Sequence, residues 1–354
     1  MVEHVGAVVP ARFDVPSLGA LRLSVEGDRL TVEATGSDGG LSRAWADDVD
    51  GEDGVAFVRC EWMVAAVRAL PRVDVTVRTD GTVMRVSAGG SRMTLRLMSD
   101  VTALEPHAKP DDPVAEFDVD EWRAALRLVK PVTRAAVVRS NPVLVGAHLA
   151  MAGGVLCVEA CDMYRIARAA VSPVGGDGSI PAMDLICPAE RLEVAGGAGR
   201  VALGFSDRTV TVETDSTLDT SILVDGVFPS VDGLMPDSYN STVDLPVDEF
   251  RGALTRALMV AGSSSASLKI HAGDDGVDIS LDNMVSEMSS SDVVYGELDG
   301  EPFTVLLDPR YVQHAVTVAS GASVRLARRR GAKSVVFRDP EREGMLVAVV
   351  PKAF

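Results

Sequence analysis

Residues 119–126 read Val-Asp-Glu-Trp-Arg-Ala-Ala-Leu, and residues 247–254 read Val-Asp-Glu-Phe-Arg-Gly-Ala-Leu. Each copy follows a short alternating segment, at residues 115–118 and 242–245, and opens a pattern typical of a helix. The acid at the second position suits a helix start, where unpaired N–H groups and the helix dipole favour negative charge. A fainter copy stands at residues 59–67, Arg-Cys-Glu-Trp-Met-Val-Ala-Ala-Val. The chain is therefore predicted to contain an internal repeat.

A second pattern recurs in step with the first. Residues 19–34, 146–160 and 267–280 each read as an alternating strand, a turn containing Gly and a second strand. Alternation with a period of two on both sides of such a turn is typical of a β-hairpin with one buried face. Chance could produce one match, but two motifs that recur in the same order indicate true repetition.

The last two copies also share a shorter helix and another hairpin. Residues 187–192 and 307–312 place Pro near a first helical turn, where its missing N–H costs little. Hairpins are predicted after them at residues 201–213 and 324–337. These units therefore read as strand, helix, hairpin, further strands, helix and hairpin.

Segments rich in Pro, Asp and Gly near residues 108–113 and 229–240 are expected to join the repeats. We predict an α+β protein with three similar domains in tandem, at residues 1–112, 113–236 and 237–354.

Bulk properties exclude some classes of protein and leave others open. The net charge of −17 does not exclude a nucleic-acid ligand, because the position of the charges matters more than their sum. The four cysteines, which form no CxxC pair and have no His cluster near them, give no reason to expect zinc: Cys60, Cys157, Cys161 and Cys187. No run of about 18 apolar residues appears, so we expect a protein of the cytoplasm without a membrane span.

The segment 120–130 combines an apolar face with a basic face. Its apolar side chains at helical spacing are Trp122, Ala125, Leu126 and Val129. Its basic side chains are Arg123, Arg127 and Lys130, and the run continues with Arg134 and Arg139. Pro131 should end or kink a helix, so Arg134 and Arg139 are expected in a loop. A basic stripe is an exception in so acidic a chain, although a solvated helix face is the simpler explanation.

Three further motifs resemble a known family. Residues 161–167, Cys-Asp-Met-Tyr-Arg-Ile-Ala, are similar to that family's Thr-Asp-Gly-His-Arg-Leu-Ala. Residues 223–230 with the Leu-Met-Pro at 234–236 are similar to its Gly-x-Phe-Pro-Asp-Tyr segment and closing Pro, and residues 346–351 to its terminal strand. The chain thus resembles the bacterial β sliding clamps, the processivity subunits of DNA polymerase III, from about Val8 to Phe354.

The resemblance implies a ring-shaped homodimer without a catalytic site or cofactor. Two copies would join head to tail, with helices lining a pore around double-stranded DNA and antiparallel sheets outside. Contacts that allow sliding should be directed at phosphates and independent of sequence. The candidate pore residues are Arg123, Arg127, Lys130, Arg134, Arg139 and Arg68.

The resemblance also implies a pocket for short linear motifs of the replicative polymerase, the clamp loader and repair proteins. It would be an apolar groove with Arg165 as a charged residue at its rim, suited to Leu or Phe anchors. Met163 stands where the family usually has Gly, which would narrow the groove. The residues carried over to this pocket are Leu144, Cys161, Met163, Tyr164, Arg165, Ile166, Pro229, Leu234, Val349, Val350 and Pro351.

Ring closure depends on the first repeat, which is shortened at its N-terminus relative to the family's opening strand and helix. The implied dimer interface brings Trp62, Ala66, Leu70, Met93 and Leu95 of one subunit against Leu268 and Ile270 of the other. The shortening leaves open an alternative, a monomeric clamp-like scaffold that binds peptides without encircling DNA. An enzyme is disfavoured, since the chain has no GxSxG, no Gly-rich phosphate loop and no HExxH.

Overall fold

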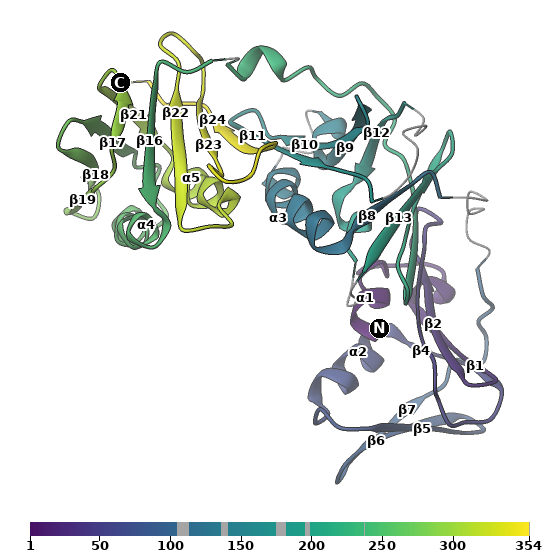
Figure 1. Ribbon diagram of the computed structural model, residues 1–354. Helices are drawn as coiled ribbons and strands as arrows, with labels where there is room; N and C mark the ends of the chain where they lie inside the picture. The colour runs from purple at the N-terminus through teal and green to yellow at the C-terminus, as the bar shows by residue number, and fades with distance from the viewer. Residues whose placement is uncertain (105–112, 136–140, 175–181, 195–198, 237, 354) are drawn as a thin grey trace. The chain divides into compact units, whose positions relative to one another are not determined.

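The computed structural model describes most of the chain, namely residues 1–104, 113–135, 141–174, 182–194, 199–236 and 238–353 (Figure 1). The chain divides into two compact units. Unit 1 comprises Met1–Arg123, Pro173–Pro181 and Glu190–Leu223. Unit 2 comprises Ala124–Ser172, Ala182–Ala189 and Val224–Phe354.

The first repeat opens with a five-residue helix and continues through four strands, a second helix and three more strands. Its elements are α1 (Val2–Gly6), η1 (Pro16–Gly19), β1 (Ala20–Glu26), β2 (Arg29–Thr35), β3 (Leu41–Ala46), β4 (Gly54–Arg59), α2 (Cys60–Ala69), β5 (Val75–Asp80), β6 (Val83–Ala88) and β7 (Ser91–Arg96).

The second repeat opens with a strand and a long helix. Its elements are β8 (Ala115–Asp118), α3 (Val119–Ala135), η2 (Pro142–Val145), β9 (Gly146–Ala152), β10 (Val155–Cys161), β11 (Arg165–Val171), β12 (Asp184–Pro188), η3 (Ala189–Leu192), β13 (Arg200–Phe205), β14 (Thr209–Glu213), β15 (Thr217–Ile222) and η4 (Asp232–Leu234).

The third repeat has the same order with one additional short strand, β20. Its elements are β16 (Ser241–Pro246), α4 (Val247–Ala261), β17 (Leu268–Gly273), β18 (Gly276–Asn283), β19 (Met288–Val294), β20 (Leu298–Gly300), β21 (Phe303–Leu307), α5 (Pro309–Ala315), η5 (Val316–Val318), β22 (Ser323–Arg328), β23 (Val335–Arg338) and β24 (Met345–Val349).

The α+β class and the triplication are therefore confirmed, but one copy of the helical motif was assigned wrongly. The copy at residues 59–67 lies at the end of β4 and in α2, which follows four strands, whereas α3 and α4 precede the hairpins β9–β10 and β17–β18. By its place in the order, α2 corresponds to η3 and α5. The helix that precedes the first hairpin is α1.

Strands from neighbouring repeats pair with each other. In unit 1 the strand order is β4-β1-β2-β3-β15-β14-β13-β8, so β3 of the first repeat pairs with β15 of the second. In unit 2 the order is β12-β9-β10-β11-β24-β23-β22-β16-β20, and β11 pairs with β24 of the third repeat. Two smaller sheets are β5-β6-β7 and β19-β18-β17-β21. The boundaries expected near residues 112 and 236 stay predictions.

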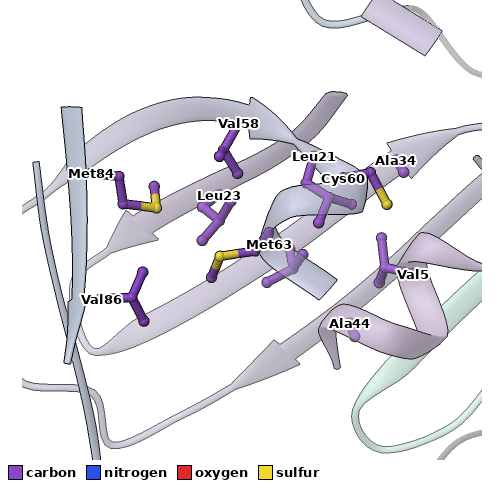
Figure 2. Close-up of a cluster of buried hydrophobic side chains, with 11 residues drawn as sticks. Val5, Leu21, Leu23, Ala34, Ala44, Val58, Cys60, Met63, Met84 and Val86 are labelled. Atoms are coloured by element: carbon purple, nitrogen blue, oxygen red, sulfur yellow. The ribbon is translucent and has the colours of Figure 1, made fainter. Parts of the chain in front are cut away.

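The core of the first repeat shows why these elements form. Alternating residues of β1, β2 and β4 point to one side and meet α1 and α2, as Figure 2 shows for Leu21, Leu23, Val58, Val5 and Met63. The free Cys60 belongs to this cluster, and its burial raises the pKa of the thiol to about 11. Such burial of a thiol in apolar surroundings makes it unreactive.

Helix α3 continues through Pro131 to Ala135, so the expectation that Arg134 lies in a loop was wrong. Pro131 is exposed, and the carbonyl that lacks its N–H partner can bond to water on that side. The side chain of Asp118 caps the helix by accepting hydrogen bonds from the backbone N–H groups of Asp120 (2.9 Å) and Glu121 (3.0 Å).

Candidate nucleic-acid interface and peptide site

Helix α3 is buried over most of its circumference. Trp122, 1% exposed, donates a hydrogen bond from Nε1 to the carbonyl of Leu192 at 2.8 Å and packs on Phe117 in unit 1. The predicted apolar face is thereby confirmed for Trp122, Ala125, Leu126 and Val129, all of them buried.

The basic face of α3 is narrower than its sequence pattern suggested. Arg127 and Arg134 are exposed, and Arg123 is half-buried with Nη1 at 3.4 Å from the carboxylate of Asp120. Lys130 is only 8% exposed, so its assignment to the same open face was wrong. Other parts of the protein cover more of the circumference of α3 than the four predicted apolar residues indicated, and this cover includes Lys130. Arg139 lies outside the described residues.

Arg68 lies on α2 in unit 1 and is largely exposed. Its guanidinium donates a hydrogen bond to Glu3 of α1, and this bond and the positive charge lower the pKa of the Glu3 carboxyl group. The charge of Arg68 is therefore partly compensated within the chain.

The turn between β10 and β11 is organised by Asp162. Its Oδ1 accepts hydrogen bonds from the backbone N–H groups of Tyr164 (3.1 Å) and Arg165 (2.9 Å). Met163 adopts a φ of +76° in this turn, and its side chain is 73% exposed. A positive φ is a conformation that glycine adopts without steric cost, so Met163 is held there against its own preference.

The side chain of Arg165 is buried and links two segments by hydrogen bonds, so its assignment to the pocket rim was wrong. It is 6% exposed, donates from Nε to Asp162 Oδ2 at 2.8 Å and from Nη2 to the carbonyl of Pro131 at 2.9 Å. Its guanidinium lies 4.8 Å from the ring centre of Tyr311, which stacks on Tyr164 at 6.0 Å. The motif match indicated its place, but only the packing shows that its donors point inward.

Two residues of α5 join this cluster and were missed from the sequence: Tyr311 and His314. His314 donates a hydrogen bond from Nε2 to the carbonyl of Leu128 on α3 at 2.8 Å. Burial, with the nearby charge of Arg165 adding to it, lowers the pKa of His314 to about 4. The only sequence signal was their position in the short helix after Pro309.

One group of the predicted pocket residues is buried and would form the floor of the predicted site. Leu144, Cys161 and Ile166 belong to one buried cluster in unit 2, and Leu234 packs against it as a half-buried neighbour. Val349 is also fully buried, and it pairs with Arg165 across β11 and β24. The predicted floor is therefore apolar, and backbone hydrogen bonds between β11 and β24 run beside it.

A second group of predicted residues lies at the surface. Met163, Tyr164 and Pro229 are exposed, and Val350 and Pro351 are half-buried. The N–H of Val350 donates to the carbonyl of Tyr164 at 2.8 Å, which places Val350 beside the 162–165 turn. The structure thus brings the predicted pocket residues into one region of unit 2.

A charged network holds the loop that carries Leu234. Arg168 donates hydrogen bonds to Glu159 and, at 2.7 Å, to Asp232 in η4. His148 lies 3.2 Å from Glu159 and 2.8 Å from Asp184. Burial acts to lower the pKa of His148, but these two carboxylates outweigh it and raise the pKa.

The residues predicted for the dimer interface differ in accessibility. Trp62 is 40% exposed with Arg59 over its ring, and Leu70, Met93 and Leu95 are half-buried. Leu268 and Ile270 are fully buried because they point to the inward face of β17, opposite to the exposed Lys269, so their assignment to the interface was wrong. Ala66 is 2% exposed and likewise offers almost no surface.

Comparison with known proteins places these features in a family. A model of the DNA polymerase III beta subunit N-terminal domain matches residues 1–101, and a model of the C-terminal domain of the same subunit matches residues 232–353. The chain belongs to the DNA polymerase III beta subunit family. The N-terminal and C-terminal regions of the chain thus match the corresponding domains of one family.

Relatives within the family are similar over almost their whole length. The beta sliding clamp of Caulobacter vibrioides is 26% identical, over 98% of this chain and 95% of that protein. The beta sliding clamp of Vibrio cholerae is 23% identical, over 99% of this chain and 96% of that protein. The crystal structure of the Bacillus subtilis DNA polymerase sliding clamp covers 100% of this chain with a TM-score of 0.82 at 17% identity, and 96% of that structure is covered. A Pseudomonas aeruginosa sliding clamp bound to griselimycin has a TM-score of 0.79 at 21% identity, with the same two coverages.

Proposed function

We propose that this protein is a DNA sliding clamp. The observation that carries the proposal is the extent of the similarity, which spans all three repeats and 95% of the length of a curated beta sliding clamp. A chain similar to clamps in one domain alone could have many functions. This chain has all three repeats, and these are the domains from which a clamp ring is assembled.

Two copies form a ring around duplex DNA. Arg127 and Arg134 are exposed on the same side of α3, two helical turns apart, about 10 Å along the axis. Positive charges on one face of a helix attract backbone phosphates and carry no information about the bases. Contacts of this kind hold the duplex weakly and permit sliding.

The ring closes where sheets end in unpaired strands. β19 is the outer strand of the sheet β19-β18-β17-β21, and β7 is an outer strand of β5-β6-β7. Met288 and Val293 on β19 are 45% and 52% exposed, and nearby Met259 on α4 is 69% exposed. An edge with open backbone groups and apolar neighbours is a template for pairing with another chain. In the proposed dimer, β7 of one copy, with Met93 and Leu95, pairs with β19 of the other.

Partners dock on the apolar floor of the peptide site in unit 2. An extended segment with Leu or Phe anchors can pack against Leu234 and the surface of Tyr164, while the tied turn at Asp162 keeps the site in place. The replicative polymerase and the clamp loader are the partners we propose for it.

The protein performs no covalent step in this role, and the clamp acts in the cytoplasm, where the DNA is. Among the described residues, no three His, Cys, Asp or Glu side chains are grouped to hold a metal ion. Within the same residues, no helix is long and apolar enough to cross a membrane.

The test is retention on DNA of different topology. Loaded with a clamp loader onto a nicked circle, the protein should stay bound in high salt and be lost when the circle is cut. Loss of the protein in high salt from the circle that has not been cut would contradict encirclement, because salt weakens electrostatic contacts but does not open a ring.

One observation favours a second candidate, the monomeric scaffold that binds peptides without encircling DNA. The sheet β5-β6-β7 of the first repeat has three strands, whereas the second repeat contributes four strands to the corresponding sheet (β15-β14-β13-β8) and the third contributes five (β24-β23-β22-β16-β20). Helix α1 has five residues where α3 has 17. Light scattering separates the candidates, since a ring requires the mass of a dimer and the scaffold gives that of a monomer.

A further inference from the structure

The turn between β22 and β23 carries a cluster of positive charge. Arg329, Arg330 and Lys333 are all exposed there, in a chain whose net charge is −17. The sequence alone allows either a DNA contact or a solvated hairpin tip. The surroundings of the turn distinguish these possibilities.

The cluster forms one wall of a cavity of about 420 Å³ in unit 2. The opposite wall is the segment 232–236, which includes Leu234 and Met235. Both of these apolar side chains pack against the buried cluster beneath the peptide site. The groove therefore has a basic side and an apolar side, and the apolar side is continuous with the proposed docking floor.

Hydrogen bonds hold the basic turn in place, and one of them joins it to the apolar wall. Ser334 Oγ donates to the carbonyl of Leu234 at 2.5 Å, and the N–H of Arg330 donates to Asn240 Oδ1 at 3.0 Å. The N–H of Asn240 donates in turn to the carbonyl of Arg328 at 2.9 Å. The cations are thus presented by a tethered turn beside the apolar wall.

Among the described residues, the acids near the groove leave its charge positive. Asp232 is bound to Arg168 at 2.7 Å. Glu301 lies 3.7 Å from Arg330, but both side chains are largely exposed to water, which makes such a pair weak. Arg329 and Lys333 form no ion pair with any residue in the described part of the chain.

We propose that the peptide docked in this site carries acidic residues directly beside its apolar anchor, and that Arg329, Arg330 and Lys333 bind them. This inference rests on the proposed peptide-binding function and names the chemistry of the partner. An apolar wall next to a basic wall fits a peptide with both kinds of side chain better than a nucleic-acid backbone, which has no apolar anchor to place there.

The experiment compares two fluorescent peptides that differ only in charge. Both have Leu and Phe anchors, followed by Asp-Asp in one and Asn-Asn in the other, and binding to the full chain is followed by anisotropy. We expect the Asp-Asp peptide to bind about fivefold to tenfold more tightly in low salt, and the difference to shrink in high salt, because exposed pairs are screened.

A double variant, Arg329→Gln with Lys333→Gln, should reduce the difference to less than about twofold. The matched control is Arg251→Gln with Lys269→Gln, which removes two exposed cations from α4 and β17 and should preserve the difference. Circular dichroism checks that both variants are folded.

Each other outcome overturns the inference in a distinguishable way. Equal binding of both peptides to the native chain leaves the peptide site intact and refutes the acidic partner. Absence of binding by either peptide refutes the site itself, and the inference with it. If a single-stranded oligonucleotide loses affinity in the Arg329 and Lys333 variant while the peptides do not differ, the turn is a nucleic-acid contact.

Discussion

At the residue scale, His314 makes the stability of the fold depend on pH. Its Nε2 donates to the Leu128 carbonyl, and burial lowers its pKa from 6.5 to about 4. The fold therefore holds the neutral imidazole. The stability that His314 contributes is fully present above about pH 6.5 and is lost as the pH falls toward 4. The shift corresponds to about 3 kcal/mol at most.

The variant His314→Gln tests this coupling. Glutamine can keep an N–H donor for the Leu128 carbonyl but does not titrate between pH 7 and 4. We expect the free energy of unfolding of the native chain to fall over that range by up to about 3 kcal/mol more than that of the variant. Urea unfolding at several pH values measures the difference. Parallel curves for the two proteins would show that His314 is not responsible.

The motif at residues 161–167 predicted some features of its residues and missed others. The match at residues 161–167 includes Cys161 and Ile166, which lie in one buried apolar cluster with Leu144, and their role in a peptide pocket stays a prediction. It could not indicate that Arg165 points inward, because the carbonyl of Pro131 and the ring of Tyr311 come from elements distant in sequence. Burial of a long cation depends on partners that a local pattern does not contain.

At the scale of the element, α3 determines the proposed contact with DNA. Removing two of its exposed charges, with Arg127→Gln and Arg134→Gln, should weaken binding to duplex DNA about tenfold in low salt. It should also reduce the slope of log affinity against log salt by about two, one for each phosphate that the variant no longer neutralises. Binding measured by anisotropy across a salt series gives both quantities.

The control for α3 is a pair of exposed cations on other elements, Arg208→Gln with Lys269→Gln. An equal loss in this control would mean that total charge, and not the face of α3, governs binding. The sequence predicted the existence of α3 and its apolar side from spacing alone. The burial of Lys130 and the passage through Pro131 depend on what packs around the helix.

At the scale of the whole molecule, the ring depends on the outer strand β19. A charge on this strand, as in Val293→Lys, would have to be desolvated at the proposed interface without a partner. We expect the dimer dissociation constant to rise at least about tenfold, so that light scattering detects monomer. Lys269, which is already exposed on β17, provides the control Lys269→Glu, for which dimer mass should be retained. A dimer unaffected by Val293→Lys would place the interface elsewhere.

The sequence by itself determined the α+β class, the triplication and the family, because strand alternation, helical spacing and turn residues are local properties that recur within each repeat. Only the tertiary structure showed that β11 pairs with β24 and that the side chains of Leu268, Ile270 and Arg165 are buried. These outcomes depend on pairing and packing between segments far apart in the chain. The free energy gained when a side chain is buried depends also on the residues that pack against it, so the pattern of one segment cannot predict which of its side chains are buried.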